Sequence, residues 1–328
     1  MVIVTGANGL LGSFIVRQLI TQGNPFIALK RKDSDTSLLD DVAHHITWKD
    51  VDVLDPVALH ETFEEATHVI HSAAIVSFNP RHKKRIFQIN VEGTKNVVDA
   101  CLATNIKRLV HISSVAALGR QKDQRHIDEN ARWIDSPLNS AYAESKYQAE
   151  LEVFRAHEEG LQIAVLNPSV ILAPADWNKS SATLFRYAWH EHLFYINSLI
   201  NYVDVRDVAK AAIELLHSSV DGERFIVSGG TLTNKELFEK MALRWNKKPP
   251  SIKVSKNILM AAARIEQFRS WLLTSEPLLT RETARIANTF FSYNNEKIIK
   301  TLEFRFQSID ETLQWCCDYY MTKFSTKK

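Results

Sequence analysis

The first 170 residues alternate short apolar runs with longer segments of helical periodicity. The runs are rich in valine and isoleucine, and most lack the in-and-out alternation of a half-exposed strand, which is typical of strands buried on both faces. They are Val2–Thr5, Phe26–Leu29, Ile46–Trp48, His68–His71, Leu109–Ser113 and Ile163–Leu166. Because alternating strands and helices connect by right-handed crossovers, the pattern predicts an α/β fold with a doubly wound parallel sheet.

Helix signals fill the segments between these runs. The predicted helices are Leu11–Gln22, a helix opened by Asp55 and Pro56 that runs to Glu65, Asn90–Ala103 and Tyr142–Glu159. Gly23 directly follows the first helix and suits its C-terminal cap. Asp55 is a favourable N-cap, and proline is tolerated at the first helical position.

The rhythm changes after residue 170, where aromatic residues cluster between 177 and 195. One more helix–strand unit, Val205–His217 followed by Phe225–Ser228, is expected to return to the sheet. From Thr231 the pattern is mostly helical, with a short extended piece at Ser251–Val254. We therefore predict a nucleotide-binding domain over residues 1–170 with 200–230 returning to it. Residues 171–199 and 231–328 are predicted to form a smaller, mainly helical substrate-binding part.

Composition narrows the functional classes. The 328 residues are 45% hydrophobic and 24% charged, which is typical of a soluble globular protein. A net charge of +2 does not suggest a nucleic-acid partner. Three cysteines, Cys101, Cys316 and Cys317, are too few for a disulfide framework, so we expect reduced thiols and a cytoplasmic protein.

No targeting segment or metal-ligand cluster stands out in the sequence. No uninterrupted apolar stretch reaches the roughly 18 residues that a membrane-spanning helix needs. The stretch Ile258–Leu273 is apolar with interspersed charges, which fits an amphipathic membrane helix but more commonly indicates a helix facing a core. We expect no membrane partner and no bound metal.

A glycine-rich turn joins the first predicted strand to the first predicted helix. Glycines allow a tight turn and the close approach of a pyrophosphate to the helix N-terminus, where free N–H groups and the helix dipole favour anions. The strand–turn–helix context makes the motif specific. It predicts a Rossmann-type dinucleotide site whose first residues are Gly6, Asn8, Gly9, Leu10, Leu11 and Gly12.

The end of the second strand indicates which dinucleotide is preferred. An acidic residue there binds the ribose 2′-hydroxyl of NAD, whereas an arginine accommodates the 2′-phosphate of NADP. The sequence has Lys30, Arg31 and Lys32, with no acid before Asp33. This favours NADP, with NAD possible, and Arg31 as the phosphate partner. The alternative is a solvated basic loop.

Two further strand ends add candidate cofactor contacts. Asp52 and Val53 follow the third strand, and the aspartate could accept from the adenine amino group or cap a turn. Ser72, Ala73 and Ala74 end the fourth strand with small side chains, which would let a cofactor lie close to the backbone.

A tyrosine and a lysine supply the candidate chemistry. Tyr142 and Lys146 are four residues apart and therefore share one face of a predicted helix. A phenol with a pKa near 10 is a poor acid or base at neutral pH, and a neighbouring ammonium lowers that pKa. Ser113 and Ser114 end the fifth strand at the carboxyl edge, where doubly wound sheets bind ligands.

Together these motifs resemble the extended short-chain dehydrogenases/reductases of the NAD-dependent epimerase/dehydratase superfamily, and most closely the dihydroflavonol-reductase-like enzymes. The resemblance rests on TGANGLLG (5–12), DVLD (52–55), HSAA (71–74), NVEGT (90–94), HISSVAALG (111–119), YAESK (142–146), NPSVILAP (167–174) and YVDVRDVA (202–209).

The resemblance assigns roles to individual residues. It implies Tyr142 as general acid/base, Lys146 as its helper and Ser114 as the catalytic serine. It also implies that Asn90 supports a proton-relay water, that Ser113 lines the cofactor and that Pro168 and Ser169 border the nicotinamide. The 4,6-dehydratases of the family carry Asp-Glu after the catalytic residue, whereas Val115 and Ala116 follow Ser114 here, which argues against dehydration.

The expected function is an NADP(H)-dependent oxidoreductase that reduces an aldehyde or ketone of a small or hydrophobic molecule. The alternatives are an NAD(P)-dependent nucleotide-sugar epimerase and a catalytically silent NADP-binding regulator. The resemblance also implies a homodimer, because the helices Asn90–Ala103 and Tyr142–Glu159 match those that pair in dimeric family members.

Overall fold

A seven-stranded parallel sheet forms the centre of the computed structural model, which describes residues 1–119, 125–136, 139–178, 180–255, 257–259, 261 and 290–325. The strands are β1 (Val2–Thr5), β2 (Phe26–Lys30), β3 (Trp48–Asp50), β4 (His68–His71), β5 (Arg108–Ile112), β7 (Gln162–Pro168) and β11 (Glu223–Val227). Their order is β11-β7-β5-β4-β1-β2-β3, and every pair is parallel. The predicted doubly wound sheet is confirmed.

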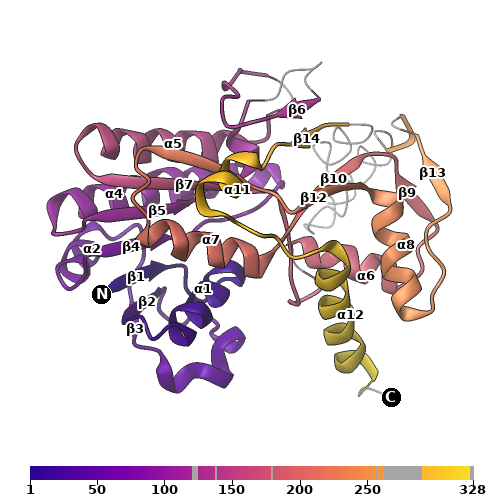
Figure 1. Cartoon of the computed structure of the whole chain (residues 1–328), viewed down its shortest axis with the longest axis horizontal. Helices are drawn as coiled ribbons and strands as arrows, with labels where there is room; N and C mark the ends of the chain where they lie inside the picture. Colours follow the sequence, from indigo (N-terminus) through magenta and orange to yellow (C-terminus); the bar gives the residue numbers. More distant parts are fainter. Residues whose placement is uncertain are drawn as a thin grey trace.

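The strands are apolar throughout because both faces of the sheet are covered. Val2 and Val4 of β1 pack into one core cluster, and Ile3 between them packs into the other. Helices α1 (Leu10–Thr21) and α7 (Val205–His217) cover the first face. Helices α2 (Pro56–Phe63), α4 (Gly93–Ala103) and α5 (Ala141–Glu158) cover the second face. Figure 1 shows these two helical layers on opposite sides of the strands.

Local capping follows the sequence signals closely. The Asp55 carboxylate accepts from the backbone N–H groups of Val57 and Ala58, so Asp55 is the N-cap of α2 as predicted. Gln22 is the C-terminal cap residue of α1, and Gly23 follows it with a φ of 68°. This left-handed conformation is the reason that a glycine ends the helix.

Two predicted boundaries are wrong. The third strand is β3 rather than Ile46–Trp48, because the backbone N–H of Ile46 closes a 3₁₀ turn by donating to Ala43. The apolar pattern reflects packing against the core, and this packing starts earlier along the chain than strand pairing does. The helix predicted at Asn90–Ala103 starts earlier, since α3 (Lys83–Phe87) continues through a π-helical turn (Gln88–Glu92) into α4.

The second part of the molecule combines short strands and helices. A three-stranded sheet contains β8 (Val170–Leu172), β10 (Leu199–Asp204) and β12 (Gly230–Thr233). The pairs β9 (Phe194–Ile196) with β13 (Ile252–Val254), and β6 (His126–Ile127) with β14 (Ser292–Tyr293), complete the strands. The helices are α6 (Thr183–Trp189), α8 (Asn234–Trp245), α11 (Glu296–Leu302) and α12 (Ile309–Ser325). Figure 1 shows α6, α8 and α12 grouped beside the main sheet.

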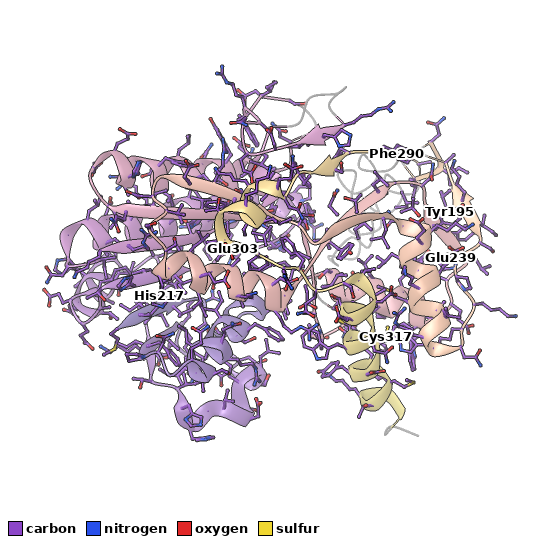
Figure 2. The ribbon with its side chains drawn as sticks, viewed as in Figure 1. Tyr195, His217, Glu239, Phe290, Glu303 and Cys317 are labelled. Carbon is purple, nitrogen blue, oxygen red and sulfur yellow. The ribbon has the colours of Figure 1, made fainter. Side chains whose placement is uncertain are left out.

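An aromatic core holds these helices together. The rings of Trp177 and Phe324 stack with centroids 3.6 Å apart, and Phe185 contacts Tyr320. The Trp245 indole donates to the backbone oxygen of Cys317 at 3.1 Å, which links α8 to α12. Cys317 is labelled on α12 in Figure 2. The aromatic residues that the sequence placed between 177 and 195 thus include members of a packed core.

Polar contacts tie α12 and the segment before it to α7. Asp204 caps α7 by accepting from the backbone N–H of Arg206, and it forms an ion pair with the Arg206 guanidinium at 2.6 Å. Thr312 of α12 donates to Asp204 at 2.8 Å, and the backbone N–H of Gln307 donates to Asp207 at 2.9 Å. Asp204 therefore both caps α7 and takes part in an ion pair.

None of the helices within the described ranges is long and apolar enough to cross a membrane. Most of the predicted amphipathic stretch, residues 258–273, falls outside those ranges.

Candidate active site

The glycine-rich turn between β1 and α1 has a backbone that only glycine fits. Gly6 has a φ of 64°, and the backbone N–H of Gly9 donates to its carbonyl oxygen at 3.0 Å. A Cβ on Gly12 would lie 2.1 Å from that same oxygen. The turn therefore brings the start of α1 close to the end of β1, as pyrophosphate binding requires.

The N-terminus of α1 can accept an anion. Gly9 is its N-cap and supplies no side-chain acceptor. The first-turn N–H groups of Leu10 and Leu11 have no partner within the helix, because the first four amides of any α-helix lack one. The Asn8 side chain instead donates to the backbone oxygen of Asp35 at 2.9 Å, which ties the turn to the loop after β2. These residues fit a dinucleotide pyrophosphate.

Three cationic side chains lie at the end of β2, of which one pairs with a neighbouring strand and two are exposed. Lys30 forms an ion pair with Asp50 of β3 and so helps join two neighbouring strands. Arg31 and Lys32 are exposed, and neither forms an ion pair with another residue in the described ranges. Both cations are available to a phosphate at the adenosine end of a dinucleotide.

The next two strand ends differ in what their side chains do. Asp52 accepts from the backbone N–H of Leu54 at 3.0 Å, so its carboxylate caps a turn. Val53 packs against Gly93, where a Cβ would lie 2.7 Å from a Val53 methyl group. Ser72 donates to the backbone oxygen of Thr5 at 2.8 Å, which holds the end of β4 against the end of β1.

Small residues continue this edge beside the glycine turn. A Cβ on Gly6 would lie 2.7 Å from the Ala73 Cα, so the two backbones are in direct contact. Ala73 is half-buried and Ala74 is exposed at the start of the loop that follows. Ala74 is therefore accessible at this strand edge, whereas the backbones of Gly6 and Ala73 leave no space between them.

Tyr142 and Ser114 meet at the carboxyl edge of the sheet. Ser140 caps α5 by accepting from the backbone N–H of Ala143, which fixes the turn that carries Tyr142. The pKa of the Tyr142 phenol is raised, because the effect of burial exceeds that of the Ser114 hydroxyl, which lowers it. The Ser114 hydroxyl also accepts from the backbone N–H of Ala116 at 3.2 Å. The Phe78 ring packs edge-on against the Tyr142 ring, with centroids 5.9 Å apart.

Lys146 lies one helical turn beyond Tyr142 and is 1% exposed. Its ammonium donates to the backbone oxygen of Ile112, at the end of β5, at 2.8 Å. Burial lowers its pKa to about 8, and the nearby Glu150 carboxylate acts in the opposite direction. An ammonium with this pKa is largely charged at neutral pH and can hold a polar group near Tyr142.

Asn90 sits in the π-helical turn and clamps the loop after β4. Its side chain accepts from the backbone N–H of Ile75 at 2.8 Å and donates to the backbone oxygen of the same residue at 3.0 Å. It also donates to the Ser145 hydroxyl at 3.0 Å, which connects this clamp to α5. The side chain thus fixes the loop that carries Phe78 toward Tyr142.

Buried hydroxyls complete the edge beside these groups. The hydroxyl of Ser113 is buried and helps to lower the pKa of Glu150, but it has no hydrogen-bond partner among the described residues. Pro168 ends β7 in a buried position. The Ser169 hydroxyl is also buried and has no hydrogen-bond partner among the described residues. A buried hydroxyl without a partner at this strand edge fits a polar group of a bound cofactor.

Sequence reasoning missed Glu150, Asn167 and Phe78. Glu150 is buried on α5 four residues after Lys146, and the Asn167 amide on β7 donates to it at 2.5 Å. The i, i+4 spacing from Lys146 was a signal for the first, but helical carboxylates at that spacing are usually exposed. No local pattern in the sequence indicates Phe78, because its position beside Tyr142 depends on the loop that Asn90 holds in place.

A comparison with protein families matches residues 2–228 to the NAD dependent epimerase/dehydratase family. The putative dihydroflavonol 4-reductase of Synechocystis sp. is 33% identical over 63% of this chain and 60% of its own length. Sterol demethylase protein B of Methylococcus capsulatus is 27% identical over 72% of each chain. Among solved structures, gox2253 superposes with a TM-score of 0.85 at 26% identity and covers 99% of this chain and 98% of its own.

Three observations agree: the family match, the glycine-rich turn between β1 and α1, and the arrangement of Ser114, Tyr142 and Lys146. The family match covers most of the chain, and the relatives include named reductases and dehydrogenases. The chain therefore belongs to the NAD-dependent epimerase/dehydratase family, and it is an NAD(P)-dependent oxidoreductase of the extended short-chain dehydrogenase/reductase type.

Proposed function

We propose that the protein reduces an aldehyde or ketone of a small or hydrophobic substrate with NADPH, using Ser114, Tyr142 and Lys146. The observation that carries this proposal is the arrangement of Ser114 and the buried Tyr142 phenol, whose pKa the Ser114 hydroxyl lowers, with the buried Lys146 ammonium one helical turn away. The bound cofactor supplies the hydride. The residues of the chain position the substrate oxygen and deliver a proton to it.

Each side chain then has a distinct task. As negative charge builds on the substrate oxygen, the Ser114 hydroxyl donates a hydrogen bond to it and Tyr142 protonates it. Lys146 remains cationic, holds the cofactor ribose and stabilises the ionised phenol after the proton has gone. Asn90 keeps the neighbouring loop in place, and Ser169 borders the nicotinamide.

The Tyr142→Phe variant tests this assignment. It removes the proton donor but keeps the ring that packs on Phe78, so turnover should fall by roughly 10²-fold or more with NADPH affinity nearly unchanged. Lys146→Met should reduce both turnover and NADPH affinity. The measurement is NADPH oxidation on a panel of aldehydes and ketones, with cofactor affinity from fluorescence titration. Near-normal turnover by Tyr142→Phe on a substrate that the wild type reduces would refute the assignment.

Arg31 should set the preference for NADP(H) over NAD(H), because its guanidinium can pair with the 2′-phosphate. Arg31→Asp should weaken NADPH binding and improve NADH binding, and titration of both cofactors measures this. Lys30→Gln is the matched control, since Lys30 is already paired with Asp50. Equal affinities of the wild type for the two cofactors, or tighter NADH binding, would contradict the prediction.

The substrate contacts are proposed to come from residues 171–199 and 231–328. Phe78, which is exposed and packs against Tyr142, supports an apolar substrate, as do the exposed Val76 in the same loop and the relative named for sterol demethylation. UDP-glucose belongs in the same panel, because conversion of the sugar without net NADPH consumption would favour a nucleotide-sugar epimerase. Tight NADPH binding with no turnover of any compound would favour a silent regulator.

We further propose that the protein is a cytoplasmic homodimer that pairs through α4 and α5. Leu151 supports the pairing surface, because this apolar side chain on α5 is 50% exposed. Three buried free thiols, Cys101, Cys316 and Cys317, support a reducing compartment.

A further inference from the structure

Beneath the catalytic side chains lies a buried carboxylate that the reaction described above does not use. Glu150 is 2% exposed on the inner face of α5, one turn beyond Lys146. Removing a carboxylate from water is costly unless it is paired and hydrogen-bonded. The surroundings of Glu150 should therefore show what stabilises it and what it acts on.

Two strands contribute partners to this carboxylate. From the edge strand β11, Arg224 forms an ion pair with Glu150 at 3.3 Å. From β7, the Asn167 amide donates to its other oxygen at 2.5 Å. Burial raises the pKa of Glu150, and the Ser113 hydroxyl beyond the end of β5 acts in the opposite direction, although that hydroxyl has no hydrogen-bond partner among the described residues.

Through Asn167, Glu150 reaches the backbone of the candidate catalytic serine. The Asn167 amide nitrogen donates both to Glu150 and to the backbone oxygen of Ser114, the latter at 3.0 Å. Because one NH₂ group makes both bonds, the carboxylate fixes which way the amide points. The position of Ser114 therefore depends on Glu150.

Glu150 also determines the electrostatics around Lys146. Among the described residues, it is the carboxylate that raises the pKa of Lys146, which burial lowers to about 8. The other titratable neighbours are His71 on β4, His111 on β5 and Tyr142. Burial and Lys146 lower the pKa of both imidazoles, that of His71 to about 3, so both are neutral. They provide no negative charge.

We propose that Glu150 is a positioning residue of this site, whose buried carboxylate keeps Lys146 cationic and, through Asn167, holds the backbone that carries Ser114. Arg224 is the counter-ion that helps to keep this carboxylate ionised. The proposal rests on the role given above to Lys146, but it makes a separate prediction about cofactor binding.

The Glu150→Gln variant keeps the shape and hydrogen-bonding capacity of the side chain and removes its charge. Without the carboxylate, Lys146 loses its proton at lower pH. A hydrogen bond from a charged donor is stronger than one from a neutral donor, so the loss should weaken NADPH binding several-fold. Titrating NADPH fluorescence between pH 7 and 10 should show this weakening with a midpoint at lower pH than in the wild type.

Arg224→Gln should shift the midpoint in the same direction. Loss of the counter-ion raises the pKa of the buried Glu150, which favours its neutral form and removes negative charge from the surroundings of Lys146. Arg224 is 25% exposed on an edge strand, so this variant decides the question even if Glu150→Gln does not fold. Glu152→Gln is the control, since Glu152 lies on the same helix, pairs with Arg155 and should leave the midpoint unchanged.

The outcomes separate this proposal from the proposed function. Shifts to lower pH for both Glu150→Gln and Arg224→Gln, with no shift for Glu152→Gln, support the positioning role. Coincident midpoints for the folded variants and the wild type overturn it, even when Tyr142→Phe is inactive. If Tyr142→Phe keeps its turnover while the midpoints shift, the proposed catalytic assignment fails and the effect of Glu150 on the cofactor site stands.

Discussion

Single residues at this site are constrained by close backbone contacts rather than by side-chain chemistry alone. Gly12 illustrates this, because the atom that a Cβ would meet is the carbonyl oxygen of Gly6, part of the backbone rather than the end of a flexible side chain. The turn cannot absorb a methyl group without moving the start of α1.

Gly12→Ala should therefore damage cofactor binding as well as stability. Overpacking of this kind costs about 1–3 kcal/mol of the free energy of unfolding, and the displaced α1 amides should weaken NADPH binding markedly. Gly23→Ala is the control: its φ of 68° makes alanine strained, but no atom lies within 4 Å of the added Cβ.

Thermal melts and NADPH titrations of both glycine variants separate the two effects. Both variants should unfold at lower temperature: Gly12→Ala through overpacking, and Gly23→Ala because alanine in the left-handed region costs about 1–2 kcal/mol. Only Gly12→Ala should lose cofactor affinity. Unchanged affinity in Gly12→Ala would show that the turn is not the phosphate site.

At the scale of secondary-structure elements, α5 contributes side chains to three different surroundings: the site, the core and the protein surface. Tyr142, Lys146 and Glu150 face the site and the polar layer below it, and Val153 packs into the core beneath the sheet. Leu151 points away from both and is half exposed. An apolar side chain in this position fits a surface that a second copy covers.

Leu151→Arg should convert the proposed dimer into a monomer, because the pairing of two copies around a two-fold axis would bury two like charges together. Sedimentation velocity at micromolar concentration measures the change. Leu243→Arg is the matched control, since Leu243 is 80% exposed on α8. A wild type that sediments as a monomer would contradict the dimer itself.

At the scale of the whole molecule, the two parts are joined by polar contacts between α7 and the C-terminal segment. Asp207 is buried in this junction, where burial and the neighbouring Asp204 raise its pKa to about 7. Gln307, Arg206 and Lys210 act in the opposite direction. The folded protein therefore holds a proton on Asp207 at pH values where the unfolded chain, with a pKa near 3.8, does not.

This difference makes the stability of the protein depend on pH. Because the folded-state pKa is raised, the contribution of Asp207 is fully present below about pH 4 and is lost as the pH rises through about 7. Asp207→Asn cannot ionise, so it should remove up to about 3 kcal/mol of the decline between pH 5 and 8, at about 1.4 kcal/mol per pKa unit.

Denaturant unfolding of the wild type and of Asp207→Asn at pH 5 and pH 8 measures this decline. Asp40→Asn, at an exposed position of the 3₁₀ turn Ser37–His45, should behave like the wild type. An equal decline in the wild type and in Asp207→Asn would mean that Asp207 is ionised in the folded protein throughout this range.

The sequence alone determined the architecture of the sheet and the local signals within it. Strands buried on both faces produce uniform apolar runs, and caps such as Asp55 and Gly23 depend on their immediate neighbours. The positions of Gly12, Tyr142, Lys146 and Ser114 were also predictable, because their motifs are short and contiguous. Such features depend on interactions within a few residues.

Tertiary structure decided what surrounds those motifs. Glu150, Asn167 and Arg224 come from α5, β7 and β11, and only the order of the strands brings them together. Sequence spacing also does not show that Lys30 is used to join two strands while Arg31 remains exposed. Burial, charge pairing and pKa depend on neighbours that are distant along the chain, and so they follow from the fold rather than from the local sequence.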